Sequence, residues 1–320
     1  MGLEIGVSLP ITGDDIPDVA VTARYAEAAG FDSVWVGDHL ADGRPLLEST
    51  VALAAAAAVT ERVRIGFGVL QLAMRPPAWA AKQIGSLQYL SRNRLTVGVG
   101  VGGSVPDEWR AAGVPLRGRG DRTDRALAVL PGLLAGEPAD LAGLAAGPGG
   151  ELTGTTLTLA PAVPRPPVWI GGGSDRALRR AAEYGDAWLA AATPPGELAA
   201  AGGRLAELAQ ERNRPVPQVA VLAIAAGVRE PGGRAAENVA AFLSGRLGMA
   251  PERAAAAAVG GDAPRIAEQL AAYAAAGVHH VVLAPFGPGW QQQFDVFAEA
   301  RELLAGAASG AGDESDVRGS

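Results

Sequence analysis

The sequence predicts an α/β fold, a (β/α)8 TIM barrel, and three observations support this prediction. Eight short apolar strands alternate with helical segments, and such an alternation gives a parallel sheet that is either open or closed into a barrel. Eight units within 320 residues favour the closed barrel. The second strand ends in an Asp-His pair, and a barrel of this type carries its chemistry at the carboxyl ends of its strands.

The predicted strands are short runs of apolar, often β-branched residues bounded by Gly, Pro or charged residues. The first strand, 4–9, ends at Pro10, and the second, 31–39, begins after Gly30. The other strands are predicted at 63–70, 95–100, 168–171, 187–190, 219–228 and 281–284.

The predicted helices lie between these strands. In 15–29, apolar side chains recur three and four residues apart as far as Gly30, a residue that commonly ends a helix. Pro45 and Pro76 each open a helix. The helices after the first are predicted at 46–60, 76–91, 119–134, 174–184, 196–212, a stretch from 235, 264–276 and about 291–304.

One stretch interrupts the alternation. From 136 to 167, Gly, Ala and Pro dominate, and only 152–159 alternates as a pair of strands would. We interpret this stretch as an insertion in the barrel. We therefore predict a single domain over residues 1–308, followed by a disordered tail at 309–320, which is rich in Gly, Ser and Asp.

The composition excludes several classes of function. A net charge of −7 does not suit binding along nucleic-acid phosphates, so we predict no nucleic-acid partner. The absence of cysteine excludes disulfides, thiolate metal sites and cysteine nucleophiles, and we predict no metal site. The longest apolar run, 51–59, is about half a membrane span, and the N-terminus lacks the basic start of a signal peptide. We expect a soluble, cytoplasmic enzyme without membrane contact.

His39 is the leading candidate for a catalytic residue. Because side chains alternate along a strand, His39 and Gly37 share one face and Asp38 points to the other, and the small Gly37 leaves room for a flat ring. Imidazole titrates near neutral pH, so His39 can move a proton; a histidine that is only hydrogen-bonded at a strand end is the alternative. We name His39 and Asp38 as catalytic candidates. His279 and His280 precede the last strand, where the barrel's stability face predicts a structural role.

A glycine-rich segment, 98–103, follows the fourth strand with the spacing G-x-G-x-x-G. A dinucleotide fingerprint also requires a helix that opens at the third glycine, and Ser104-Val105-Pro106 follows instead, so this interpretation is weak. We favour a loop without side chains, in which the backbone at Gly100 and Gly102 can approach a planar cofactor.

A second glycine-rich segment lies at the start of a predicted helix. Gly172 and Gly173 follow a strand, and Ser174 is placed to cap the helix, which is the geometry that binds phosphate through free backbone N–H groups. An ordinary glycine-rich turn is an equally good interpretation. Asp175 counts against a phosphate, because its charge would repel one.

Together these segments resemble the luciferase-like monooxygenase superfamily over nearly the whole chain. Their order is specific, whereas any single segment would be weak. The segments that carry the resemblance are 30–40 (GFDSVWVGDHL), 62–66 (RVRIG), 75–78 (RPPA), 80–83 (AAKQ), 95–102 (LTVGVGVG), 166–172 (PPVWIGG) and 180–188 (RAAEYGDAW). The resemblance implies a (β/α)8 barrel with an insertion, and a homodimer formed through the Ala-rich helix at 46–60.

The resemblance also implies a reduced flavin-type cofactor, either FMN or the deazaflavin F420. Asp38-His39 resembles the F420-dependent branch, in which this His lies beside the reacting ring, and Val101 stands where many FMN-dependent members carry a phosphate-binding Arg. We therefore favour F420 slightly. The family's bulge in the third strand, often a non-prolyl cis peptide, maps to Gly68-Val69 and would support the ring from behind. The predicted cofactor-binding residues are Gly68, Val69, Gln71, Gly100, Gly102, Gly172, Gly173 and Ser174.

Two departures from the family concern the substrate. The sugar-phosphate dehydrogenases of the F420 branch carry a Glu where this chain has Gly103 and a Trp where it has Gly43, which makes a sugar phosphate doubtful. We expect a mostly apolar small molecule instead. The predicted substrate-pocket residues are Trp35, Met74, Glu108, Trp109 and Phe286, of which each aromatic could equally be core.

The sequence thus predicts an oxidoreductase. The favoured reaction is hydride transfer between F420 and a mostly apolar substrate, with His39 moving the accompanying proton. A reduced-FMN-dependent monooxygenase of a biosynthetic pathway is the first alternative, and a non-catalytic barrel that only binds a flavin is the second.

Overall fold

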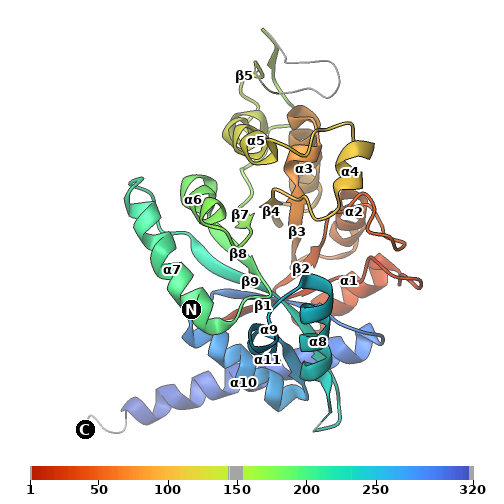
Figure 1. Ribbon diagram of the computed structural model, residues 1–320, viewed down its shortest axis with the longest axis vertical. Helices are drawn as coiled ribbons and strands as arrows, with labels where there is room; N and C mark the ends of the chain where they lie inside the picture. The colour runs from red at the N-terminus through yellow and green to blue at the C-terminus, as the bar shows by residue number, and fades with distance from the viewer. Residues whose placement is uncertain (1, 143, 145–153, 232, 317–320) are drawn as a thin grey trace.

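Eight parallel strands close into a barrel in the computed structural model, which describes residues 2–142, 144, 154–231 and 233–316, with side chains as far as residue 307 (Figure 1). The last barrel strand pairs with the first, which completes the ring. In ring order the strands are β1 (Glu4–Ser8), β2 (Ser33–Val36), β3 (Arg64–Gln71), β4 (Leu95–Gly100), β7 (Val168–Gly171), β8 (Ala187–Ala191), β9 (Gln218–Gly227) and β11 (His280–Pro285). The predicted TIM barrel is confirmed.

Helices surround the barrel (Figure 1). Side chains cap several of their first turns: the Asp18 carboxylate accepts hydrogen bonds from the backbone N–H groups of Ala20 and Val21, and Asp262 accepts one from Arg265. The helices are α1 (Val19–Ala28), α2 (Ser49–Val59), the 3-10 helix η1 (Leu72–Met74), α3 (Pro77–Leu90), α4 (Pro106–Ala111), α5 (Arg119–Leu134), α6 (Asp175–Tyr184), α7 (Pro195–Gln210), α8 (Ala235–Leu247), α9 (Pro251–Ala257), α10 (Ala263–Ala275) and α11 (Trp290–Asp316).

Strand β2 is shorter than the sequence predicts. It ends at Val36 instead of residue 39, and the chain leaves the sheet as a loop. The side chain of Asp38 does not continue the alternation, because it bonds to Ser49 of α2 and to the backbone of Gln71 at the end of β3. His39 therefore lies on a loop that follows the carboxyl end of β2.

The insertion predicted at 136–167 lies between α5 and β7. In its described part, β5 (Ala139–Asp140) and β6 (Thr156–Leu157) pair in antiparallel fashion. The first two residues of the predicted strand pair, 152 and 153, lie outside the described residues.

Two further elements differ from the expected pattern. A short strand, β10 (Val259–Gly261), is not predicted by the sequence and pairs with the carboxyl-terminal part of β9. The last helix, α11, continues to Asp316, whereas the sequence predicts a disordered tail from Ser309. Residues 317–320 lie outside the described residues.

Two tryptophans fill the inside of the barrel. The ring centroids of Trp35 and Trp169 lie 4.8 Å apart, and Trp35 is 1% exposed. The backbone of Gly66 passes so close to Trp35 that a Cβ there would lie 2.5 Å from a ring carbon. A glycine at this position therefore lets the barrel close around the indole ring.

A buried chain of hydrogen bonds lies beside these rings, at the amino-terminal ends of the strands. The indole Nε1 of Trp35 donates to Ser33 Oγ at 2.7 Å, Ser33 Oγ lies 2.8 Å from His280 Nε2, and His280 Nδ1 lies 3.0 Å from Glu4 Oε2. The Glu4 carboxylate only accepts, so His280 Nδ1 donates to it; Nε2 of the neutral ring then accepts from the Ser33 hydroxyl, which itself accepts from Trp35. His280 thus belongs to a buried structural network, whereas His279 is exposed.

Candidate active site

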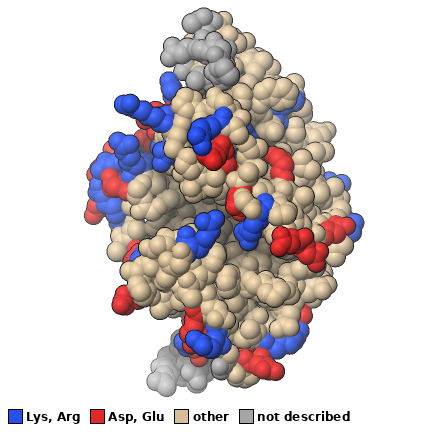
Figure 2. Space-filling model, turned by 45° about the vertical axis from the view of Figure 1, so that its right-hand side comes forward, with Lys and Arg blue, Asp and Glu red and all other residues tan. Residues whose placement is uncertain are grey.

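A pocket of about 770 Å³ opens where β1, β2, β9 and β11 end. The molecular surface is hollowed near the middle of one face, with charged side chains of both signs around the hollow (Figure 2). His39 and Gly37 line the pocket, and no atom lies within 4 Å of a Cβ added to Gly37, so the pocket is open beside this residue. The apolar walls of the pocket are Leu9, Ile11, Leu46, Ile224, Phe242, Phe286 and Trp290.

Glu108 is hydrogen-bonded to the loop that carries His39. Its side chain, in the first turn of α4, is 1% exposed, whereas that of His39 is 37% exposed. His39 Nδ1 lies 3.1 Å from both carboxylate oxygens of Glu108, and the backbone N–H groups of Leu40 and Ala41 donate to Oε1 at 2.6 and 3.0 Å. Nδ1 of His39 is thus occupied, and Nε2 is the ring nitrogen that remains for a ligand.

Asp38, the second catalytic candidate, turns away from His39 and joins three elements. Its carboxylate forms two 2.7 Å contacts with the guanidinium group of Arg75 and accepts hydrogen bonds from Ser49 Oγ and the backbone N–H of Gln71. Burial raises the pKa of Asp38, but the hydrogen bonds and charge of Arg75, with the other two donors, outweigh burial and hold this pKa below its usual value. Asp38 therefore supports the loop as an ionised, buried anchor.

The strand-three bulge lies where the resemblance places it. The peptide bond between Gly68 and Val69 is cis, and the pairing of β3 with β4 shifts register between Phe67 and Leu70. The glycines of β4 make room for the bulge, since a Cβ on Gly100 would lie 2.4 Å from Val69 Cγ2. Gly98 and Gly171 approach the same bulge closely, so these glycines accommodate protein side chain and backbone.

Gln71 and Gly102 fit tightly against each other beneath the site. Gln71 Nε2 donates to the carbonyl oxygen of Asp38 at 2.8 Å and lies 3.5 Å from Glu108 Oε2. A Cβ on Gly102 would lie 1.9 Å from Gln71 Oε1, so this position requires glycine. Both residues connect the loops that surround His39.

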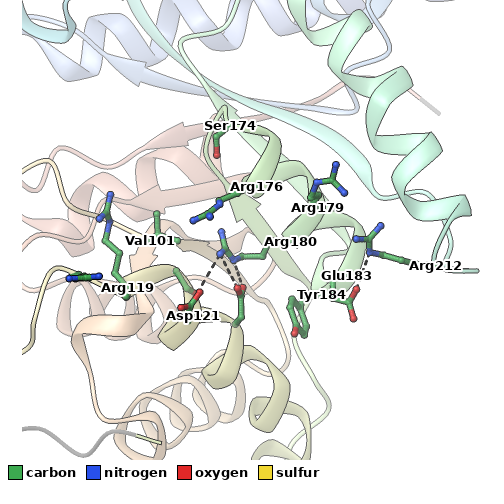
Figure 3. A pocket seen from close by; sticks show the side chains of 14 residues that line it. Val101, Arg119, Asp121, Ser174, Arg176, Arg179, Arg180, Glu183, Tyr184 and Arg212 are labelled. Atoms are coloured by element: carbon green, nitrogen blue, oxygen red, sulfur yellow. Dashed lines mark hydrogen bonds and ion pairs between the residues drawn. The ribbon is translucent and has the colours of Figure 1, made fainter.

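The Gly172-Gly173-Ser174 turn opens α6 at one end of a second pocket, of about 720 Å³, between α5 and α6. Ser174 Oγ accepts a hydrogen bond from the backbone N–H of Ala177, and no atom lies within 4 Å of a Cβ on Gly173. Figure 3 shows Ser174 at the top of the view, Arg176 below it near Arg180, Arg119 on the left, and Glu183 and Arg212 on the right. Its basic residues are Arg117, Arg119, Arg176, Arg179, Arg180 and Arg212.

The arginines of this pocket differ in how far they are neutralised. Arg180 and Arg212 form ion pairs with Asp124 and Glu183. The Nε of Arg119 donates to the carbonyl oxygen of Gly102. The side chains of Arg117 and Arg176 have no hydrogen-bond or ion-pair partner in the part of the chain that the structure describes. The pocket thus offers unpaired positive charge beside the start of α6.

Of the five predicted substrate-pocket residues, Phe286 lines the pocket of His39 and the other four do not; Glu108 lies behind His39, as described above. Trp35 lies inside the barrel, where it packs on Trp169. Met74 lines a separate pocket of about 330 Å³. Trp109 is 1% exposed, and the guanidinium carbon of Arg122 lies 5.7 Å from its ring centroid. Alternation and composition alone could not show that Trp35 and Trp109 are core residues and not pocket walls.

The sequence predicts Glu108 only as a wall of the substrate pocket, and its contact with His39 is not foreseen. The run Pro106-Asp107-Glu108 opens a helix with two adjacent acids, but the pattern does not tell which of them is buried. The cation-lined pocket could have been found from the sequence, because arginines cluster in the segments 117–125 and 176–180.

Among the described residues, no group of three or more His, Cys, Asp or Glu side chains is arranged to hold a metal ion. The helices of that part of the chain include none that is long and apolar enough to span a bilayer.

The pocket of His39 lies at the carboxyl ends of the strands of a closed (β/α)8 barrel, which is where barrel enzymes carry their active sites. The chain belongs to the luciferase-like monooxygenase family, whose family model matches residues 3–256. This match confirms the resemblance and, with it, the prediction of an oxidoreductase.

Similar sequences include both types of redox enzyme. An uncharacterized protein of Mycobacterium tuberculosis is 37% identical over 216 residues, which are 61% of this chain and 72% of the relative. The F420-dependent glucose-6-phosphate dehydrogenase of Beutenbergia cavernae is 34% identical over 180 residues, 54% of this chain and 52% of the relative. The 4-hydroxyprotoasukamycin monooxygenase of Streptomyces nodosus subsp. asukaensis is 33% identical over 116 residues, 36% and 31% of the two chains.

Solved structures share the fold. An F420-dependent secondary alcohol dehydrogenase, in complex with an F420-acetone adduct, superposes with a TM-score of 0.80 at 22% identity over 95% of this chain and 99% of the other. The oxygenating constituent of the Pseudomonas putida 3,6-diketocamphane monooxygenase, in complex with FMN, gives 0.71 at 16% identity over 93% and 97%. Both predicted cofactors, F420 and FMN, thus occur among proteins of this fold.

Proposed function

We propose that the protein is an F420-dependent oxidoreductase that transfers hydride between this cofactor and a mostly apolar small molecule. One observation carries the proposal: the carboxyl end of the barrel has two pockets. An open, largely apolar pocket at β1, β2, β9 and β11 contains His39, and a second pocket at β4 and β7 is lined with cations. A cofactor with a flat redox ring and an anionic tail matches these two halves.

The cation-lined pocket supports F420 over FMN. One phosphate at the start of α6 would be satisfied by the Ser174 turn and one neighbouring arginine. Arg117, Arg119 and Arg176 together offer more positive charge than one phosphate requires. F420 carries a phosphodiester followed by glutamates, so its several negative charges account for these side chains. When bound, F420 would supply hydride transfer.

His39 is the residue that we expect to move a proton. Its ring reaches the pocket, its Nδ1 is occupied by Glu108, and the space at Gly37 leaves room for the ring of the cofactor beside it. The apolar walls around it would bind the body of the substrate and exclude water. We also expect a cytoplasmic homodimer, and light scattering tests the oligomeric state.

A reduced-FMN-dependent monooxygenase is the second candidate, supported by the similarity to 4-hydroxyprotoasukamycin monooxygenase. Titration of the protein with reduced FMN and with reduced F420, followed by fluorescence, distinguishes the two. We expect F420 to bind far more tightly, whereas equal and weak binding of both would contradict the cofactor proposal. Tight binding of FMN alone would favour the monooxygenase.

Two variants extend this titration. Arg176→Ala should weaken F420 binding about tenfold, which corresponds to about 1.4 kcal/mol, because a cation next to the anionic tail is lost. Arg265→Ala is the matched control, since Arg265 lies on α10 and pairs with Glu268. His39→Ala should lower turnover by about 10²–10⁴-fold with little change in cofactor affinity; an unchanged rate would remove His39 from the reaction.

A further inference from the structure

We infer that Glu108 is a positioning residue, which fixes the tautomer of His39 and so determines that Nε2 of His39 faces the pocket as a proton acceptor. The inference rests on the proposed function, in which His39 moves the proton, and deepens it by naming the ring nitrogen that exchanges this proton and the residue that keeps the ring in position. The observation behind it is a carboxylate of 1% side-chain exposure that accepts hydrogen bonds from three successive residues of one loop.

The tautomer follows from the inventory of donors and acceptors. An ionised carboxylate only accepts hydrogen bonds, so the 3.1 Å contact between Glu108 and His39 Nδ1 requires a proton on Nδ1. In the neutral ring, Nε2 then carries a lone pair. His39 in this state accepts a proton at Nε2 when a substrate loses a hydride and a proton, and the same nitrogen returns the proton in the reverse direction.

The same carboxylate stabilises the product of that step. When Nε2 takes up the proton, the ring becomes an imidazolium, and the negative charge of Glu108 lies 3.1 Å from its Nδ1. The N–H groups of Leu40 and Ala41 hold the carboxylate in place, so no reorganisation is required when the charge appears. Glu108 thus acts on the reaction only through His39.

Other charged groups around His39 are engaged elsewhere or lie at the edge of the pocket. Asp38 and Arg75 form their own ion pair, and Asp38 is also bonded to Gln71. Asp42 and Arg44 line the pocket and pair with each other at 3.5 Å. Arg246 of α8 lines the pocket from the opposite element. Among the described residues, Glu108 is the only acid with a hydrogen bond to His39.

Nitrogen-15 NMR of the histidine-labelled protein tests the tautomer without cofactor or substrate. The chain has three histidines, so His39→Ala identifies the signals of His39. At a pH at which the ring is neutral, we expect a protonated Nδ1 and an unprotonated Nε2. A His39 with its proton on Nε2 would overturn the inference, whatever the cofactor titration gives.

Glu108→Gln tests the role of the charge. The amide oxygen can still accept from Leu40 and Ala41, while the amide nitrogen replaces one of the two acceptors at His39 Nδ1 by a donor, so the share of rings with the proton on Nε2 should rise. Turnover should fall about 10²-fold or more at unchanged cofactor affinity, and the acid limb of the pH–rate profile should move to lower pH. Unchanged NMR signals and an unchanged pH profile would contradict the inference.

Asp107→Asn is the matched control. Asp107 is the neighbouring acid of α4; its side chain is 76% exposed and forms an ion pair with Arg110. The substitution removes the same charge from the same helix without a contact to His39, so tautomer, turnover and pH profile should stay as in the unmodified protein. An equal loss in both variants would assign the effect to the charge of α4 as a whole and not to the contact with His39.

Discussion

Replacing Asp38 by Asn should destabilise the fold and leave the chemistry of His39 in place. Asp38 is 5% exposed and forms two 2.7 Å contacts with Arg75, whose side chain is 20% exposed. Breaking a buried ion pair by removing one charge costs about 3–5 kcal/mol. We expect about 3 kcal/mol here, because Arg75 retains some solvent and a 3.4 Å contact with Glu48. For a chain of 320 residues, that corresponds to a melting temperature lower by about 4–5 °C.

The pH dependence of the same variant gives a second test. The pKa of Asp38 is lowered in the folded protein, so its contribution to stability is present above the unfolded value of about 3.9 and is lost as the pH falls through the lower folded value. The difference in melting temperature between the two proteins should therefore be full at pH 7 and should shrink below about pH 4.

The assay is thermal unfolding followed by circular dichroism, together with turnover at 25 °C. Asp42→Asn serves as the control, because its 3.5 Å pair with the 62% exposed Arg44 should contribute less than about 1 kcal/mol. A melting temperature of Asp38→Asn within about 1 °C of the unmodified protein would refute the structural role. Loss of turnover without loss of stability would instead place Asp38 in the reaction.

Two further predictions concern a glycine and a histidine. Gly100→Ala brings a Cβ to 2.4 Å from Val69 Cγ2, so this variant should lose about 1–3 kcal/mol of stability and bind the cofactor more weakly. Gly37→Ala meets no atom within 4 Å, so it should keep the melting temperature and impair only ligand binding. Equal melting temperatures of the two variants would contradict this prediction. Burial lowers the pKa of His280 more than its hydrogen bond to Glu4 raises it. Below about pH 6.5 the unfolded chain therefore binds a proton that the folded chain does not bind, and the stability of the fold decreases as the pH falls. His280→Gln should flatten the melting temperature between pH 5 and 7, and an unchanged slope would show that another group causes it.

The sequence by itself determined the architecture. The alternation of strands and helices is local, because each strand is a short apolar run and each helix repeats its apolar residues at its own period. The eight predicted strands therefore match the observed ones to within a few residues, and the interruption at 136–167 falls between α5 and β7. The position of the bulge at Gly68-Val69 followed from the resemblance and is present in the structure.

The tertiary structure alone decided how the side chains of the site meet. Alternation assigns faces only while the chain is a strand, and β2 ends at Val36, so the directions of Asp38 and His39 depend on their partners. These partners, Arg75 and Glu108, lie 37 and 69 residues further along the chain, on elements that come together only when the ring of strands closes. The sequence could therefore name His39 as the residue that carries the chemistry, but only the closed barrel shows which acid holds it.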